Sequence, residues 1–154
     1  MDTVDDRVPD ELFGAFLDRM PQVCVELVVE TEAGVLLCKR ETKPRLWFWP
    51  GARLYKGERL AAAAHRVADE ELGTDVALRE RLGVHAHFWA ESETPEGVSR
   101  HTVNVVYRAA PATDAFEIDL DEQHSAYRFL AEPEPGLHEY VREYLDTYDL
   151  RAER

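Results

Sequence analysis

The stretch WPGARLYKGERLAAAAHRVADEELG, from Trp49 to Gly73, decides the fold of this 154-residue chain. A Pro-Gly turn enters a loop that ends after Gly57, and a run of strong helix formers follows and stops at Gly73. The last turn of this predicted helix carries two adjacent carboxylates, Glu70 and Glu71. Acidic side chains on a rigid helix, beside a loop that can approach a ligand, can hold a divalent cation against a diphosphate. The stretch therefore indicates a metal-assisted phosphate site.

The same stretch resembles the Nudix box, in which Gly, Glu, Arg-Glu, Glu-Glu and Gly recur at fixed spacing. The residues that match are Glu58, Arg66, Glu70, Glu71 and Gly73. Ala52 stands at the first Gly position, and Val67 stands where the family has the Glu that follows Arg. The resemblance implies an α/β fold, a Nudix-type α/β/α sandwich with a mixed β-sheet.

Hydrophobic periodicity and residue propensity predict strands and helices along the whole chain, in an order that suits this fold. The expected strands are Val23–Thr31, Val35–Arg40, Trp47–Trp49, Val76–Leu78, Leu82–Glu91, His101–Ala110 and Tyr127–Leu130. The expected helices are Pro9–Met20, Glu58–Leu72 and Leu137–Leu150, and Ser92–Ser99 is expected to be a polar loop. We interpret residues 1–154 as a single Nudix domain with an N-terminal helical segment (1–21) and a C-terminal helix (133–154).

A second block, DEQHSAYRFL from Asp121 to Leu130, looks like the C-terminal segment of the GDP-mannose mannosyl hydrolases, a Nudix subgroup. That subgroup also lacks the Glu after the box Arg, and the segments 46–51 and 87–91 resemble two of its other segments. The resemblance covers residues 23 to 130. It implies hydrolysis of a nucleotide sugar, most closely GDP-mannose, by water attack at the anomeric carbon, and it suggests a homodimer.

The resemblance also implies a magnesium site, for which Mn²⁺ is an expected substitute. Its ligands would be the backbone carbonyl of Ala52 and the side chains of Glu71 and Gln123, and Glu70 offers a further carboxylate. Adjacent helical residues point about 100° apart, so Glu71 can face the metal while Glu70 meets Arg66 four residues earlier. If the turn at Ala52 requires a positive φ, that residue would be strained.

The remaining implied roles belong to the substrate. His124 would be the general base, because an unperturbed pKa near 6.5 suits deprotonation of water near neutral pH. Arg40 and Arg53 would bind the diphosphate, since a guanidinium donates paired hydrogen bonds to phosphate oxygens. Glu26 and His87 stand at positions expected to contact the sugar or the leaving group.

Two alternatives stay open at this stage. Glu70 restores a box carboxylate not expected in the mannosyl subgroup and could support a second metal, which would favour a pyrophosphatase that cleaves at phosphorus. The departures at Ala52 and Val67 would instead suit a module that binds a nucleotide sugar without hydrolysing it.

Composition narrows the remaining functions. A net charge of −13 argues against nucleic-acid binding, which requires basic patches. No apolar run reaches the roughly 18 residues of a membrane span, and the acidic N-terminus is unlike a secretory signal, so we expect a cytoplasmic protein. The chain has 31 aspartates and glutamates and only three lysines. This composition is typical of proteins from salt-loving organisms, although acidic surfaces are common in other proteins as well. Cys24 and Cys38 are expected to be small buried hydrophobes rather than a disulfide or metal pair.

Overall fold

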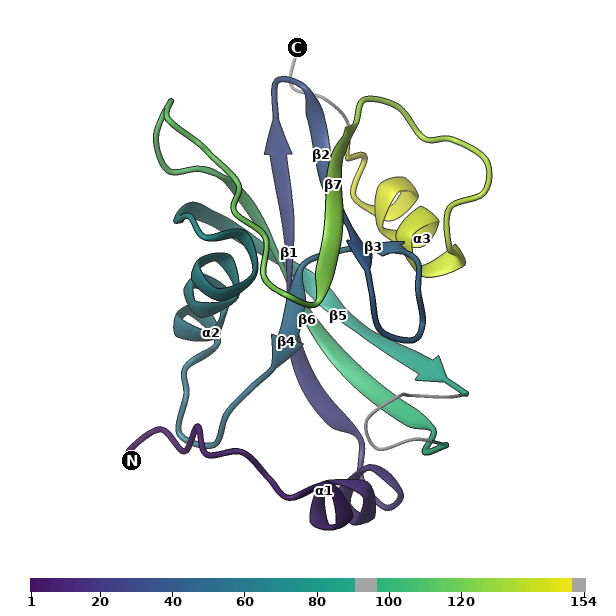
Figure 1. Cartoon of the computed structure of the whole chain (residues 1–154). Coiled ribbons are helices and arrows are strands. Elements are labelled where there is room, and N and C mark those ends of the chain that lie inside the picture. Colours follow the sequence, from purple (N-terminus) through teal and green to yellow (C-terminus); the bar gives the residue numbers. More distant parts are fainter. Residues whose placement is uncertain (91–96, 151–154) are drawn as a thin grey trace.

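The computed structural model describes residues 1–90 and 97–150 (Figure 1). In chain order its elements are α1 (Asp10–Leu17), β1 (Gln22–Thr31), β2 (Gly34–Arg40), β3 (Trp47–Phe48), β4 (Gly51–Arg53), α2 (Leu60–Val67), the π-helical turn η1 (Ala68–Leu72), β5 (Val76–Trp89), β6 (Arg100–Pro111), β7 (His124–Leu130) and α3 (Glu139–Thr147). No helix within these described ranges is long and apolar enough to cross a membrane.

The strands form a seven-stranded mixed sheet with the order β3-β2-β1-β6-β5, in which β4 also pairs with β1 and β7 with β2. β1 and β6 run parallel, whereas β1–β2, β1–β4, β2–β3, β2–β7 and β5–β6 are antiparallel. Helices α2 and α3 cover opposite sides of this sheet (Figure 1). The predicted α/β/α sandwich with a mixed sheet is therefore confirmed.

Alternation along β1 explains the two layers, because successive strand residues point to opposite faces. Val25 and Leu27 join one core cluster with Val67 of α2, and Val28 joins a second cluster with Tyr144 of α3. Each helix thus buries an apolar face against its own side of the sheet.

The sheet opens between β1 and β2, and this opening places the functional site. The two strands pair at Glu30↔Val35 and Thr31↔Gly34. Beyond that pairing β2 continues against β3 and β7, whereas β1 continues against β4 and β6. The chain crosses the opening at residues 49–50, between β3 and β4.

The expected turn around Ala52 was wrong. Residues 51–53 form strand β4, in which Ala52 pairs with Val25. Ala52 does not have a positive φ, so the strain that a turn would have imposed there does not arise. Where β1 separates from β2, the backbone of β1 has no partner in β2. Strand β4 pairs with β1 there instead.

Several predicted boundaries also require correction. The two extended segments 76–78 and 82–91 form one strand, β5, with bulges between Leu78 and Arg81 and between Arg81 and Gly83. The box helix begins at Leu60 rather than Glu58, and its last turn is π-helical. The final strand starts three residues early, at His124, because it pairs with the end of β2 at Arg40. Glu91 and most of the predicted loop 92–99 lie outside the described residues.

Candidate metal and substrate site

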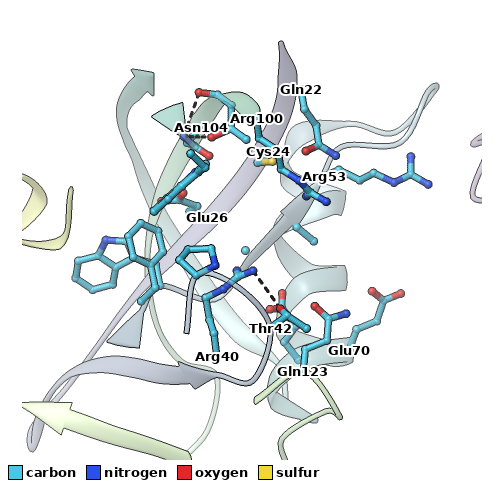
Figure 2. A pocket seen from close by; sticks show the side chains of 18 of the residues that line it. Gln22, Cys24, Glu26, Arg40, Thr42, Arg53, Glu70, Arg100, Asn104 and Gln123 are labelled. Atoms are coloured by element: carbon cyan, nitrogen blue, oxygen red, sulfur yellow. Dashed lines mark hydrogen bonds between the residues drawn. The ribbon is translucent and has the colours of Figure 1, made fainter. Parts of the chain in front are cut away.

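A cavity of about 540 Å³ occupies the opening between β1 and β2 (Figure 2). Of the nine residues assigned to the metal or substrate site from the sequence, seven line it: Glu26, Arg40, Ala52, Arg53, Glu70, Glu71 and Gln123. Two others, His87 and His124, do not line it and lie immediately behind lining residues, His87 behind Glu26 and His124 behind Glu71. The structure therefore gathers all nine residues around a single cavity.

Arg66 joins the box loop to the box helix. Its guanidinium donates to both carboxylate oxygens of Glu58, at 2.7 and 3.0 Å, to the backbone carbonyl of Arg53 at 2.8 Å, and to Glu70 at 3.2 Å. Glu58 in turn accepts from the backbone N–H of Tyr55. The expected Arg66–Glu70 contact is present, and Glu58 serves to fix the loop that carries Arg53.

We expect Arg66→Ala to lower the free energy of unfolding by about 3 kcal/mol. The substitution removes the cation that pairs with Glu58, and the carboxylate of Glu58 is nearly buried. The Glu58 side chain is 6% exposed. Urea unfolding followed by circular dichroism measures this loss. Arg59→Ala, an exposed arginine at the start of the same helix, is the matched control and should change stability by less than about 0.5 kcal/mol. Equal effects of the two substitutions would contradict the assigned role.

The π-helical turn η1 directs the two box carboxylates to different surroundings. Glu71 is 5% exposed and accepts a hydrogen bond from the backbone N–H of Gly51, whereas Glu70 is exposed at the cavity rim. Gly73 ends the turn with a left-handed φ of 63°, as the sequence predicts for a helix stop. The backbone N–H of Asp121 donates to the carbonyl of Glu71, so the loop before β7 is attached to this turn.

Glu71, Asp121 and His124 form a group whose ligand-type atoms lie within 4.8 Å of one another. One oxygen of Glu71, Oε2, is buried and has no hydrogen-bond partner among the described residues. Burial, together with the nearby carboxylate of Asp121, raises the pKa of Glu71 to about 8. A divalent cation would stabilise the buried Glu71 and the partly buried Asp121 as anions, so the donor set fits Mg²⁺, which prefers oxygen ligands. Gln123 lines the cavity beside them.

Asp121 is one site component that the sequence does not predict. It lies three residues before His124, and its Oδ1 is 2.7 Å from Nδ1 of the imidazole. The spacing of Asp121 and His124 was a usable sequence signal. An Asp three residues before a His can contact the imidazole when the residues between them form a turn. Asp121 fixes the ring orientation and directs Nε2 towards Glu71, 3.7 Å away.

Glu26 and His87 form a second buried group at the cavity. Glu26 Oε1 lies 3.7 Å from Nδ1 of His87, and the hydroxyl of Tyr144 hydrogen-bonds Glu26 and lies 3.2 Å from Nε2 of His87. Burial raises the pKa of Glu26 to about 8 and lowers the pKa of His87 to about 4. At neutral pH this contact therefore joins neutral groups rather than ions. His87 also stacks on Tyr140, with ring centroids 4.0 Å apart.

Glu26 provides a prediction for pH dependence. Its pKa is higher in the folded protein than the ordinary value of 4.5, so the folded state retains a proton that the unfolded state releases. The free energy of unfolding of the metal-free protein should therefore fall as pH rises from about 5 to 8. Glu26→Gln cannot ionise, and we expect a smaller fall. Urea unfolding of both proteins in EDTA at pH 5, 6.5 and 8 measures the difference, and parallel pH profiles would contradict it.

Basic side chains form part of the cavity lining. Five basic residues line the cavity: Arg40, Lys43, Arg53, Arg66 and Arg100. Arg40 donates to Thr42 Oγ1 at 3.3 Å, and the guanidinium of Arg53 lies over the ring of Tyr55 at 4.5 Å. In a chain with a net charge of −13, such a concentration of cations beside buried carboxylates suits an anionic ligand held together with a metal.

Comparisons with known proteins agree with this geometry. The family model of the NUDIX domain matches residues 19–148. The low-salt glycan biosynthesis protein Agl8 of Haloferax volcanii is 41% identical over 146 residues, which cover 93% of this chain and 92% of that protein.

Two solved structures are similar in fold. The MutT protein of Methanosarcina mazei has a TM-score of 0.67 and 19% identity, and the match covers 85% of this chain and 95% of that one. The MutT NUDIX hydrolase of Burkholderia pseudomallei has a TM-score of 0.64 and 27% identity, with coverage of 84% and 98%.

Proposed function

Because this chain belongs to the Nudix family, we propose that it is a hydrolase that uses Mg²⁺ to cleave a nucleotide sugar, with GDP-mannose as the substrate its residues resemble most. The observation that carries the proposal is the buried Glu71 at one side of an arginine-lined cavity. Its Oε2 has no hydrogen-bond partner in the described part of the chain, and it lies beside Asp121 and His124. That arrangement offers oxygen ligands to a cation and guanidinium donors to a diphosphate.

The nature of the substrate is supported by a relative. The Haloferax volcanii protein is named for glycan biosynthesis, and glycans are assembled from sugars activated as nucleotide or lipid-linked esters. The cavity suits such a ligand, because it combines basic side chains for the diphosphate with amides and the buried acid Glu26 for hydroxyl groups.

In the proposed reaction, water adds to the anomeric carbon, the bond from that carbon to the diphosphate oxygen breaks, and GDP leaves with the bonding electrons. His124 accepts the proton of the water on Nε2, while Asp121 holds Nδ1. Such a base commonly comes within reach of its proton only in the substrate complex, which is compatible with its position behind Glu71. Arg40 and Arg53 donate to the departing diphosphate. Mg²⁺, held by Glu71, Asp121, Gln123 and the carbonyl of Ala52, would supply positive charge to that diphosphate.

The test is hydrolysis of GDP-mannose with MgCl₂ in ¹⁸O-labelled water, with the products analysed by mass spectrometry. We expect label in mannose and unlabelled GDP. Label in a phosphate, with GMP as product, would reject attack at carbon.

Label in a phosphate would instead support the rival function, a pyrophosphatase that cleaves at phosphorus. One observation favours this rival. Glu70 lines the cavity next to Glu71, so a second carboxylate is available for another metal. Arg66 competes for that carboxylate at 3.2 Å, which weighs against a second metal. The third candidate, a module that binds nucleotide sugars without turnover, predicts metal-dependent binding of GDP-mannose with neither product.

A further inference from the structure

Residues 1–18 precede the range that matches the Nudix family, yet they are attached to the site. The backbone N–H of Val4 donates to the carbonyl of Lys56 at 2.8 Å, in the loop just before α2. Gly57 lies so close to this segment that a Cβ there would meet the carbonyl oxygen of Asp2 at 2.3 Å. The N-terminal segment is therefore seated against the box loop.

The same segment provides one wall of the cavity. Phe13 of α1 lines it, and the guanidinium of Arg100 lies over the Phe13 ring at 5.5 Å. The helix is anchored by Leu17, which is 7% exposed. An aromatic ring paired with an arginine is a common platform for stacking a nucleobase.

Polar side chains surround this platform. Gln22 and Asn104 line the same part of the cavity as Arg100, away from Glu70 and Gln123 (Figure 2). Nδ2 of Asn104 donates to Oγ1 of Thr102 at 3.0 Å, which fixes the orientation of the amide and leaves its carbonyl oxygen outside that bond. Amide and guanidinium groups recognise base edges through paired hydrogen bonds, and arginine matches O6 and N7 of guanine.

Strand geometry gives this region the right separation from the metal site. Gln22, Cys24 and Glu26 alternate along β1 and line the cavity in a row, and Glu26 pairs with Gly51, whose N–H binds Glu71. Four residues of strand span about 13 Å. A diphosphate beside Glu71 can therefore extend its nucleoside along β1 towards Arg100.

We propose that the N-terminal segment completes the active site, and that Phe13 and Arg100, with Gln22 and Asn104, form the subsite for a guanine base. This inference rests on the proposed nucleotide-sugar function, because it assigns one part of that substrate to one end of the cavity. The segment thereby supplies the stacking surface for the base, the polar groups of β1 and β6 distinguish one base from another, and the Nudix box acts on the diphosphate.

The experiment is calorimetric titration, with MgCl₂ present, of GDP, ADP, UDP and inorganic pyrophosphate into the 154-residue protein and its variants. We expect the wild type to bind GDP more tightly than the other three ligands. Phe13→Ala should weaken GDP binding about tenfold to a hundredfold and leave pyrophosphate binding unchanged, since stacking acts on the base alone. Arg100→Gln should remove the preference for GDP over ADP.

Two further variants control for folding. Phe16→Ala alters the same helix at a side chain that is 46% exposed, and it should leave GDP binding unchanged. Phe13→Leu keeps the apolar bulk and loses the aromatic face, so it should retain the wild-type melting temperature and still weaken GDP binding.

The subsite is overturned if the wild type binds GDP no more tightly than pyrophosphate, if Phe13→Ala weakens both ligands equally, or if Phe16→Ala matches Phe13→Ala. These results are separable from the fate of the hydrolysis proposal. Base-dependent binding without turnover supports the subsite and rejects catalysis. If the protein hydrolyses GDP-mannose but Phe13→Ala leaves its affinity for GDP unaltered, catalysis is supported and the subsite is rejected.

Discussion

Replacing His124 with alanine is expected to lower the turnover of GDP-mannose by about 10²- to 10⁴-fold while GDP binding persists. The structure provides the physical reason, because Asp121 holds Nδ1 at 2.7 Å and leaves Nε2 as the nitrogen that can accept a proton. Steady-state kinetics of the purified variant, with calorimetric binding of GDP, measure both quantities.

His65→Ala is the control for this experiment. His65 is exposed, pairs with Asp75 and is not among the residues that line the cavity, so its loss should leave turnover unchanged. Turnover that survives His124→Ala would remove His124 from the reaction. Asp121→Asn provides an intermediate case, since it keeps the shape of the orienting group and loses its charge. Because Asp121 is also a proposed metal ligand, turnover is measured at saturating MgCl₂, where we expect a smaller loss than for His124→Ala.

Replacing Glu71 with glutamine is expected to weaken the apparent affinity for Mg²⁺ by about a hundredfold or more. Loss of a group that merely orients a ligand commonly costs ten- to a hundredfold, and Glu71 would be a direct ligand. Titration of hydrolysis against MgCl₂ measures the effect. Removing a buried charge should also leave the metal-free variant at least as stable as the wild type at pH 8, so a lower activity could not be attributed to unfolding.

Asp69→Asn is the matched control, because it makes the same type of change on an exposed carboxylate in the same helical turn and should not alter the magnesium titration. An unaltered titration of Glu71→Gln would reject the metal assignment. Glu70→Gln distinguishes the two reaction types, since it should matter little for attack at carbon and greatly for a second-metal pyrophosphatase.

The box stretch could be interpreted correctly from sequence because its constraints are local. The i to i+4 spacing of Arg66 and Glu70 fixes their contact, and Gly73 ends the helix through a conformation that glycine adopts readily. The two faces of β1 follow equally from alternation. These features depend on neighbours a few residues away, which the sequence displays directly.

The features that were missed depend on residues far apart in the chain. The strand at Ala52 exists because β1 has parted from β2, and nothing near Ala52 encodes that separation. The position of His87 behind Glu26 depends on Tyr140 and Tyr144 of the last helix. Phe13 lies in the helix predicted over Pro9–Met20, but its place in the cavity wall follows only from the way that helix packs.

The parallel pairing of β1 with β6 also has a consequence for biogenesis. It joins residues eighty positions apart, such as Gln22 with Thr102, and Asn104 beside Cys24 belongs to the same ladder. Contacts at such separation are slow to form, because a long loop must be closed before they can stabilise the chain. During synthesis the box helix can form early, because its contacts are local. The part of the cavity lined by Arg100, Thr102 and Asn104 cannot form until β6 has been synthesised. The binding pocket is therefore among the last parts of the protein to mature.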